Sequence, residues 1–366
     1  MNRVNKSSNS DVLPKVEFED IVSGEGRLNK DISSKFDSRK GTLFEPENIL
    51  YGKLRPYLKN WLFSDFEGVA LGDFWVFEAT DVSVPSFDYY LIQSDDYQKV
   101  ANDTSGTKMP RSDWKNVSST DFAIPSKDEQ KQIGAFFKQL DDTITLHQQK
   151  ITLLIKLKKA MLEKMFPKKG TVIPEFRFNG FANAWEQRKF SELYARSSEK
   201  NDGSIGMDKN ITVAIMQFKN DVKVSTTEYL KTYYTFKLGD IAFEGHQSKE
   251  FRYGRFVEND IGNGIVSHIF AVFRPIQEYD LYFWKYAINN EALMQRILAR
   301  STKASTMMHD LVTNDFLNET FLVPSVKEQK QIGAFLNKLD NLITLHQRKL
   351  DMLKKLKSAC LSEMFI

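Results

Sequence analysis

The chain has 366 residues, a length that fits two or three domains, and its 41% hydrophobic and 27% charged residues are typical of a globular protein. A net charge of +3 permits a nucleic-acid partner without indicating one, and the single cysteine, Cys360, excludes a disulfide framework. The polar N-terminal stretch MNRVNKSSNSD lacks the apolar core of a signal peptide, and no apolar run reaches the roughly 18 residues of a membrane span. The sequence therefore predicts a soluble cytoplasmic protein.

The first 125 residues are rich in aromatic residues, Val and Ile, and are broken by Gly, Asn and Asp, which is the pattern of short strands and turns. Strands with turns are predicted in Asn48–Phe63 and in Gly68–Ala79, and helical structure follows over Ser86–Asp103. A polar stretch, TSGTKMPRSDWKN, occupies Thr104–Asn116. We assign residues 1–125 to a first globular domain.

A long helix is predicted over residues 126–166. Its opening, PSKDEQ, supplies a proline, a serine cap and then acidic residues for the first turn. Apolar residues then recur in steps of three and four over about five heptads, without a proline. A helix of about 37 residues would be about 55 Å long.

A linker at 167–171, with the sequence PKKGT, leads to a second domain at 172–324 and a second long helix at 325–366. The second domain repeats the order of the first. Strands are predicted in Phe236–Phe256 and Asn263–Pro275, helical structure over Tyr279–Ala299, and a polar stretch, RSTKASTMMHD, follows. The helices repeat the residues as well, since Pro324–Phe365 agrees with Pro125–Phe166 at 26 of 42 positions. The chain is therefore an internal duplication.

Each long helix has one apolar stripe that needs a partner, and we expect the two stripes to bury each other in an intramolecular coiled coil. The alternative is that each helix packs on its own domain. Polar residues at seam positions, such as Lys158 and Lys357, would fix the register of such a pair. The predicted seam residues are Ile133, Phe137, Leu140, Ile144, His147, Ile151 and Leu154 in the first helix, and Ile332, Leu336, Leu339, Ile343, His346, Leu350 and Leu353 in the second.

Motifs of catalysis are missing from the sequence. There is no phosphate-binding G-x-x-x-x-G-K-[ST] loop, no N-P-P-[FY] motif of a methyltransferase, and no C-x-x-C or H-E-x-x-H metal motif. The string DIGNG at Asp260–Gly264 is a turn signal only. We expect no catalytic residue and no metal site, and hence a protein that is not an enzyme.

Basic residues interleaved with aromatic and hydrogen-bonding residues are candidates for DNA contacts, because Lys and Arg neutralise phosphates while Arg, Gln, Ser and Thr read base edges. Solvated loops are the alternative explanation for such charge runs. The candidate residues are Lys53, Arg55, Lys59, Thr107, Lys108 and Arg111 in the first half, and Gln247, Lys249, Arg252, Arg255, Arg300, Thr302 and Lys303 in the second.

The repeated helix sequence KEQKQIGAFLNKLDNLITLHQRK, the stretch ILYGKLRPYLKNWLF and the segment IPEFRFNGFANAWEQRKFSEL (Ile173–Leu193) resemble the specificity subunits of type I restriction-modification systems. The resemblance covers nearly the whole chain. It implies an α+β fold with two globular mixed α/β target recognition domains, separated by two long helices that form an antiparallel coiled coil with pseudo-twofold symmetry. Each domain would then read one half of a bipartite site in double-stranded DNA.

The same resemblance implies two methyltransferase subunits and two ATP-driven restriction subunits as partners. The methyl donor, ATP and magnesium would belong to those subunits, and this chain would need no cofactor. A segment like Ile173–Leu193 usually introduces each domain, whereas the first half starts inside the domain. We therefore expect either that the true start lies upstream or that this first domain is a shortened form. A function of another class, a non-catalytic coiled-coil scaffold for protein partners, is the alternative.

Overall fold

The computed structural model describes residues 1–366 except 37, 105–107, 220–225, 307 and 366. The chain forms two compact units. Unit 1 consists of Met1–Lys150 and His346–Ile366, and unit 2 of Ile151–Leu345. Each unit therefore contains one globular domain and a part of both long helices. Within the described residues, no helix is both long and apolar enough to cross a membrane.

The globular part of unit 1 is built on two four-stranded sheets, with strand orders β1-β10-β7-β8 and β2-β6-β9-β3. All neighbours are antiparallel except β3 and β9, and a small pair, β4–β5, lies outside the two sheets. The strands are β1 Asn2–Arg3, β2 Ser7–Ser8, β3 Lys15–Val16, β4 Ile21–Val22, β5 Arg27–Leu28, β6 Gly41–Phe44, β7 Ile49–Gly52, β8 Trp61–Phe63, β9 Gly68–Ala70 and β10 Phe74–Glu78. The helices are η1 Phe18–Asp20, η2 Pro56–Leu58, α1 Pro85–Leu91, α2 Asp95–Ala101 and α3 Trp114–Ser118.

Unit 2 contains a four-stranded antiparallel sheet with the order β12-β19-β16-β17 and four two-stranded pairs, β11–β22, β13–β14, β15–β18 and β20–β21. The strands are β11 Glu186–Lys189, β12 Tyr194–Ser197, β13 Ile211–Thr212, β14 Gln217–Phe218, β15 Tyr234–Phe236, β16 Ile241–Glu244, β17 Arg255–Glu258, β18 Gly264–Val266, β19 Ala271–Pro275, β20 Thr302–Ala304, β21 His309–Leu311 and β22 Thr320–Val323. The helices are α5 Phe190–Leu193, η3 Met207–Lys209, η4 Val213–Ile215, α6 Thr227–Leu230, α7 Leu281–Ile288, α8 Glu291–Ser301 and α9 Thr313–Asn318.

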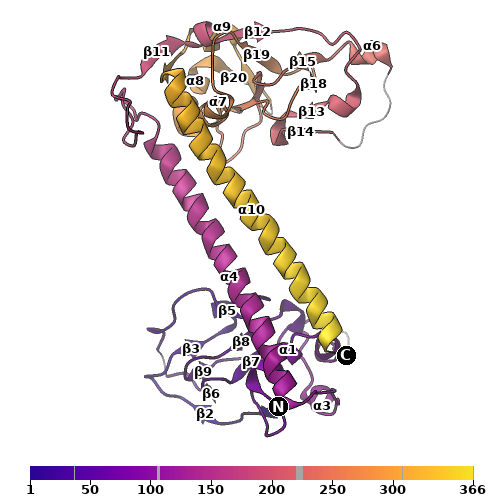
Figure 1. Ribbon diagram of the computed structural model, residues 1–366. Coiled ribbons are helices and arrows are strands. Elements are labelled where there is room, and N and C mark those ends of the chain that lie inside the picture. Colours follow the sequence, from indigo (N-terminus) through magenta and orange to yellow (C-terminus); the bar gives the residue numbers. More distant parts are fainter. Residues whose placement is uncertain (37, 105–107, 220–225, 307, 366) are drawn as a thin grey trace. The chain divides into compact units, whose positions relative to one another are not determined.

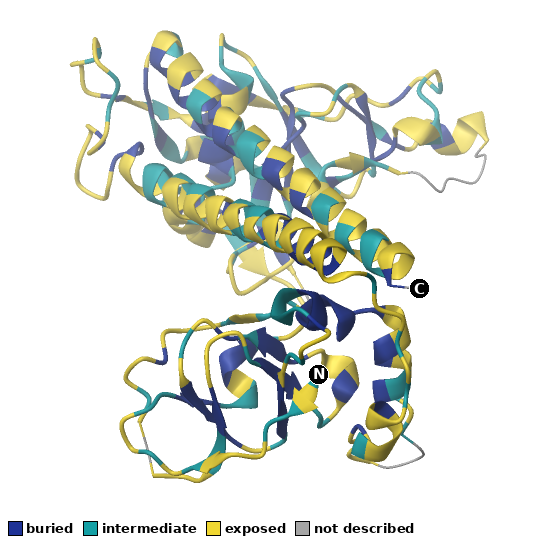
Figure 2. Cartoon of the chain, turned by 60° about the horizontal axis from the view of Figure 1, so that its bottom comes forward, coloured by how far each residue is buried: buried dark blue, intermediate teal, exposed yellow. Residues whose placement is uncertain are grey.

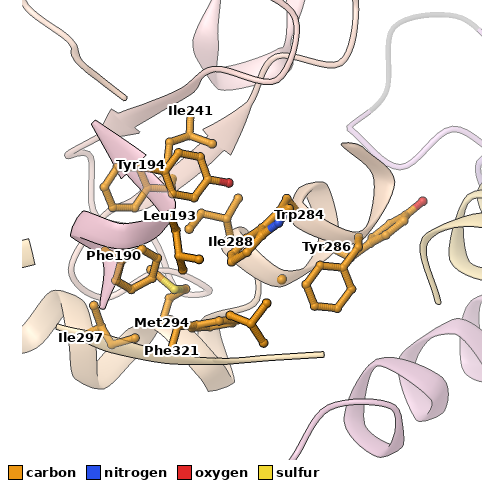
Figure 3. Packing of buried hydrophobic residues seen from close by; sticks show 14 of the residues in the cluster. Phe190, Leu193, Tyr194, Ile241, Trp284, Tyr286, Ile288, Met294, Ile297 and Phe321 are labelled. Atoms are coloured by element: carbon orange, nitrogen blue, oxygen red, sulfur yellow. The ribbon is translucent and has the colours of Figure 1, made fainter. Parts of the chain in front are cut away.

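The sheets β1-β10-β7-β8 and β12-β19-β16-β17 have the same topology, which extends the duplication from the helices to the globular parts. The core of unit 1 packs aromatic residues of this sheet against α1 and α2. The core of unit 2 packs Phe190, Tyr194, Trp284 and Phe321 together with aliphatic residues from α7 and α8 (Figure 3). Buried residues line the sheets, while the outer faces of the long helices are exposed (Figure 2).

The long helices are α4 Lys127–Lys164 and α10 Val326–Met364, and their shared EQKQIGAF sequence docks each of them on a short helix in the same way. The buried Gln130 side chain accepts a hydrogen bond from the Val84 amide at 2.9 Å, and Gln329 accepts one from the Asp280 amide at 3.1 Å. One turn later a glycine is required. A Cβ at Gly134 would lie 2.3 Å from Ser86 Oγ, and one at Gly333 would lie 2.6 Å from the Phe283 amide nitrogen.

The two helices form an antiparallel coiled coil, α4 beside α10 (Figure 1). In unit 1, Lys357 Nζ lies 2.8 Å from Asp141 Oδ1, and in unit 2, Lys158 Nζ lies 2.6 Å from Asp340 Oδ1. These two ion pairs are equivalent in the repeat, because Asp340 is the counterpart of Asp141 and Lys357 is the counterpart of Lys158. Each unit therefore contains the same helix–helix contact, as the predicted duplication requires.

Candidate nucleic-acid interface

Two of the basic stretches predicted from the sequence of the first half come together in unit 1. The loop after β7 is held to residues 110–112 by backbone hydrogen bonds from the Arg55 amide to Pro110 O, at 2.7 Å, and from the Ser112 amide to Lys53 O, at 2.8 Å. We call this backbone contact the clasp. Arg55 has a left-handed φ of 49°, a strained conformation for a residue with a side chain that persists only where its surroundings impose it.

Asp73, in the turn before β10, organises the charges at the clasp of unit 1. Its carboxylate binds Arg111 in a bidentate ion pair, with Nη2–Oδ2 at 3.0 Å and Nε–Oδ1 at 3.3 Å, and Lys53 Nζ lies 3.6 Å away. The Arg111 guanidinium holds the pKa of the Asp73 carboxyl below its usual value. Arg55 and Lys108 are exposed, and neither has an acidic partner among the described residues. Within the described part of the chain, Arg55 and Lys108 are thus cations that remain available on this surface.

The basic stretches of the second half meet in unit 2 by the same kind of clasp. The loop after β16 joins the β20–β21 hairpin through a hydrogen bond from the His309 amide to Gly245 O, at 2.8 Å, and through a bridge between His246 and Met308. A Cβ at Gly245 would lie 2.1 Å from His309 O, so this approach requires glycine. Gln247 Nε2 lies 2.9 Å from His309 Nδ1 and fixes the loop further.

The exposed candidate side chains around this second clasp are Gln247, Lys249, Arg252 and Lys303, and the acids Glu250 and Asp310 are exposed beside them. The Arg252 guanidinium lies 5.5 Å from the centre of the Tyr253 ring, a distance at which cation and ring attract each other. Both clasps therefore present cations and hydrogen-bonding groups at topologically equivalent loops, although the residues themselves are unrelated.

The remaining candidates lie elsewhere. Arg255 binds Glu244 at 2.8 Å, Arg300 forms a bidentate ion pair with Glu319, and the Thr302 hydroxyl donates to Leu298 O at 2.6 Å. These three side chains are thus engaged within the fold. Lys59 is exposed beside Glu25 and Trp61, in a cavity away from Asp73. Thr107 lies outside the described residues.

Sequence reasoning missed the residues that hold the clasps in place. Asp73 stands in a short turn, LGDF, whose sequence does not reveal a basic partner 38 positions away. The sequence around His309 gives no sign that this residue anchors the loop between β16 and β17. The close contact between Gly245 and the His309 backbone also could not be predicted, because it joins backbone groups that are far apart in the sequence.

The residues predicted at the helix seam occupy two environments. Ile133 and Phe137 are buried in the core of unit 1, and Ile332 and Leu336 in that of unit 2. The other predicted seam residues lie further along α4 and α10, outside these two cores. Leu140, Ile144, Ile151, Leu339, His346 and Leu350 are buried, while His147, Leu154, Ile343 and Leu353 are half-buried.

The two seam histidines meet in unit 1. His147 Nδ1 lies 2.8 Å from His346 Nδ1, so one ring donates its N–H to this hydrogen bond and the other ring accepts it. Burial, together with the neighbouring Lys150 and His147, lowers the pKa of His346 below its usual value. Among the described residues, no group of three or more His, Cys, Asp or Glu side chains is arranged to hold a metal ion.

Comparison with known proteins gives a match to the family described as the type I restriction modification DNA specificity domain, over residues 9–156 and 163–355. The chain belongs to this family. The match confirms the resemblance noted in the sequence and the prediction of a non-catalytic specificity component. The two matched stretches also fit the duplication, since each includes one clasp and part of one long helix.

Individual relatives agree with the family assignment. The chain is 23% identical over 270 residues to the type I restriction enzyme MjaVIII specificity subunit of Methanocaldococcus jannaschii. The match covers 69% of this chain and 63% of that relative, so the chain aligns with less than two thirds of its length.

Solved structures share the fold. The crystal structure of a type I restriction-modification S subunit from M. genitalium has a TM-score of 0.60 at 14% identity, with 100% of this chain and 97% of that chain covered. A chain from a study of complex assembly and conformational transition of the type I R-M system has a TM-score of 0.52 at 16% identity, with 97% and 93% covered.

Proposed function

We propose that this specificity protein reads a bipartite site in double-stranded DNA, with the clasp of unit 1 at one half-site and the clasp of unit 2 at the other. The observation that carries the proposal is that equivalent loops are held by equivalent backbone contacts but present different side chains. Different residues on a shared frame are what two independent readers of different base sequences require. The repeated helices would set the distance between the half-sites.

Recruitment of partner subunits is supported by apolar residues exposed on the long helices. Unit 1 exposes Leu146, Met352 and Leu356, and unit 2 exposes their repeat counterparts Leu345, Leu153 and Leu157. Exposed apolar side chains that lie next to one another mark interaction sites, and Met352 and Leu356 stand one helical turn apart, as do Leu153 and Leu157. The same set in both units would offer two equivalent docking sites, which fits two methyltransferase subunits and, with them, two ATP-dependent restriction subunits. The methyl donor, ATP and magnesium would be bound by those partners.

The proposal is tested by selecting bound sequences from a DNA library randomised at both half-sites, with the methyltransferase subunits present. Replacing Arg55 and Lys108 with Ala would change the preference at one half-site, and replacing Lys249 and Arg252 with Ala at the other. The cost is about 1–3 kcal/mol for each side chain that contacts a base. Lys150→Ala, an exposed change on α4, is the control. Altered preferences in both halves after a change in one unit would contradict modular reading.

A further inference from the structure

A short 3₁₀ helix, η2, lies in the loop that forms the clasp of unit 1 and exposes two apolar side chains. Pro56 is buried, whereas Tyr57 is 57% exposed and Leu58 is 37% exposed. Lys59 ends the turn with a left-handed φ of 54°, and its carbonyl accepts a hydrogen bond from the Gly24 amide at 2.9 Å. The turn is therefore fixed on one side by the clasp and on the other by the β4–β5 turn.

A second 3₁₀ helix, η4, repeats this pattern in unit 2, although it lies between β13 and β14 instead of after β16. Its first residue is buried, Ile215 is 63% exposed, and Met216 ends the turn with a left-handed φ of 45° while packing against the core. The Arg255 guanidinium donates hydrogen bonds to Ala214 O at 2.6 Å and to Glu244 Oε2 at 2.8 Å. Because Glu244 is the last residue of β16 before the second clasp, Arg255 holds η4 beside that clasp.

The conformation of both turns distinguishes these side chains from ordinary exposed apolar residues. Single exposed apolar residues are common on protein surfaces and by themselves indicate nothing. Among the described residues, however, three of the four residues other than glycine with a positive φ flank η2 and η4, namely Arg55, Lys59 and Met216. Such a backbone is strained and persists only where its surroundings impose it. Each turn therefore presents its apolar side chain on a backbone that cannot easily adjust.

The surroundings of both turns are basic. Residues 53–60 contain three cations and no acid, and the neighbouring Glu25 is already held in an ion pair. In unit 2, Lys209 and Lys219 flank β13 and β14 with no acid between them, while Asp208 lies just outside. An apolar side chain among cations suits duplex DNA better than it suits an apolar protein surface, because DNA places stacked bases between rows of phosphates.

We propose that Tyr57 and Ile215 each enter the DNA duplex as a wedge between two neighbouring base pairs, one in each half-site. The proposal rests on the proposed function, since it requires the clasps to lie on DNA, and it adds how the DNA is deformed there. An apolar side chain that enters a base step opens the stack and kinks the duplex, and cations beside it bind the flanking phosphates. A turn that is fixed before binding avoids the entropy loss of ordering the wedge on the DNA.

A wedge recognises DNA differently from the polar side chains of the clasps. Tyr57 and Ile215 would enter a step without hydrogen-bonding to base edges, so they favour steps that open easily over particular bases. Pyrimidine–purine steps are the ones that kink and unstack most readily. We therefore expect one such step in each selected half-site, at the position where the DNA is kinked.

The test uses the full chain with the methyltransferase subunits, bound to the duplex obtained by selection from the randomised library. The base analogue 2-aminopurine, whose fluorescence rises when it is unstacked, is placed at successive positions of each half-site. Tyr57→Ala is expected to abolish the rise at one step in one half-site, and Ile215→Ala at one step in the other. Each variant should also bind DNA at least about fivefold more weakly, which corresponds to the loss of one stacking contact.

Conservative and distant variants separate a wedge from a structural role. Tyr57→Phe retains the ring and should retain both the fluorescence rise and the affinity. Val82→Ala and Leu238→Ala remove apolar side chains that are 57% and 47% exposed, and both variants should bind DNA like the wild type. Val82 follows β10 and Leu238 precedes β16, so each lies at the end of its sheet opposite to the clasp.

The proposal is overturned, while modular reading stands, if the wild type selects a bipartite site without unstacking any step, or if Tyr57→Ala and Ile215→Ala unstack and bind DNA as it does. It is also overturned if either variant changes the preferred bases and leaves the unstacking intact, because the side chain would then read base edges. Loss of the methyltransferase subunits from either variant, with DNA bound as before, would assign the turn to a protein partner instead. If the wild type selects no bipartite site, the proposed function itself fails, and the wedge fails with it.

Discussion

The replacement Arg177→Ala is expected to destabilise unit 2 strongly, because it leaves a carboxylate buried without its cation. Glu328 is 1% exposed and receives both of its short hydrogen bonds from Arg177, whose own side chain is 13% exposed. Removing one partner of a buried ion pair costs about 3–5 kcal/mol, mostly from the uncompensated charge that remains. For a domain of this size such a loss lowers the midpoint of thermal unfolding by several degrees.

The repeat provides a matched control for this experiment. Glu129 occupies the position of Glu328 but is exposed, so Glu129→Ala should change the free energy of unfolding by no more than about 0.5 kcal/mol. The double variant Arg177→Ala with Glu328→Gln should recover part of the loss, because the buried charge is removed with its partner. Calorimetry and denaturant titration measure all three variants. Equal stability of Arg177→Ala and Glu129→Ala would refute the argument that this ion pair stabilises unit 2.

Three further predictions concern stability. Ile144→Asp places a charge at a buried position of α4 and should lower the unfolding free energy by several kcal/mol, whereas Lys150→Ala at an exposed position should change it little. Equal denaturation midpoints for the two variants would show that α4 is not packed as described. Because the pKa of His346 is lowered in the fold, its contribution to stability is present above about pH 6.5 and is lost as the pH falls through its folded pKa. His346→Gln should therefore reduce the loss of unfolding free energy on acidification, measured by unfolding curves at a series of pH values. The same loss in the variant and the wild type would contradict the prediction. The buried Glu258 carboxyl has no hydrogen-bond partner among the described residues, and burial raises its pKa well above the usual value, so the wild-type chain loses stability as the pH rises. Glu258→Gln should therefore be more stable at neutral pH by about 1–3 kcal/mol, and a lower melting temperature of this variant would count against the prediction.

The helices could be predicted from the sequence because their signals are local. The spacing of Ile133, Phe137 and Leu140 is visible within a few turns, and the repeat at a fixed offset doubles the evidence. The strands around Asn48–Phe63 and Phe236–Phe256 were found for the same reason, since β-branched and aromatic residues stand between turn signals there.

The arrangement of the basic residues could not be predicted, because it depends on partners far away in the sequence. Arg55 and Arg300 are both exposed arginines in polar stretches. Arg300 is bound to Glu319, whereas Arg55 has no acidic partner among the residues that the structure describes. The clasp itself is made by backbone groups, such as the Ser112 amide and Lys53 O, which every residue carries and which therefore leave no mark on the sequence.

The contact between His147 and His346 imposes a small but unavoidable inequality on the duplicated helices. Each ring is the repeat counterpart of the other, and the same nitrogen of each faces its copy at 2.8 Å. Only one proton fits between them, so one histidine must be the donor tautomer and the other the acceptor. Two arrangements follow, related by transfer of a proton and a change of tautomer at both rings. At this contact the two repeated helices carry the same residue, but the two histidine rings cannot adopt the same tautomer at the same time.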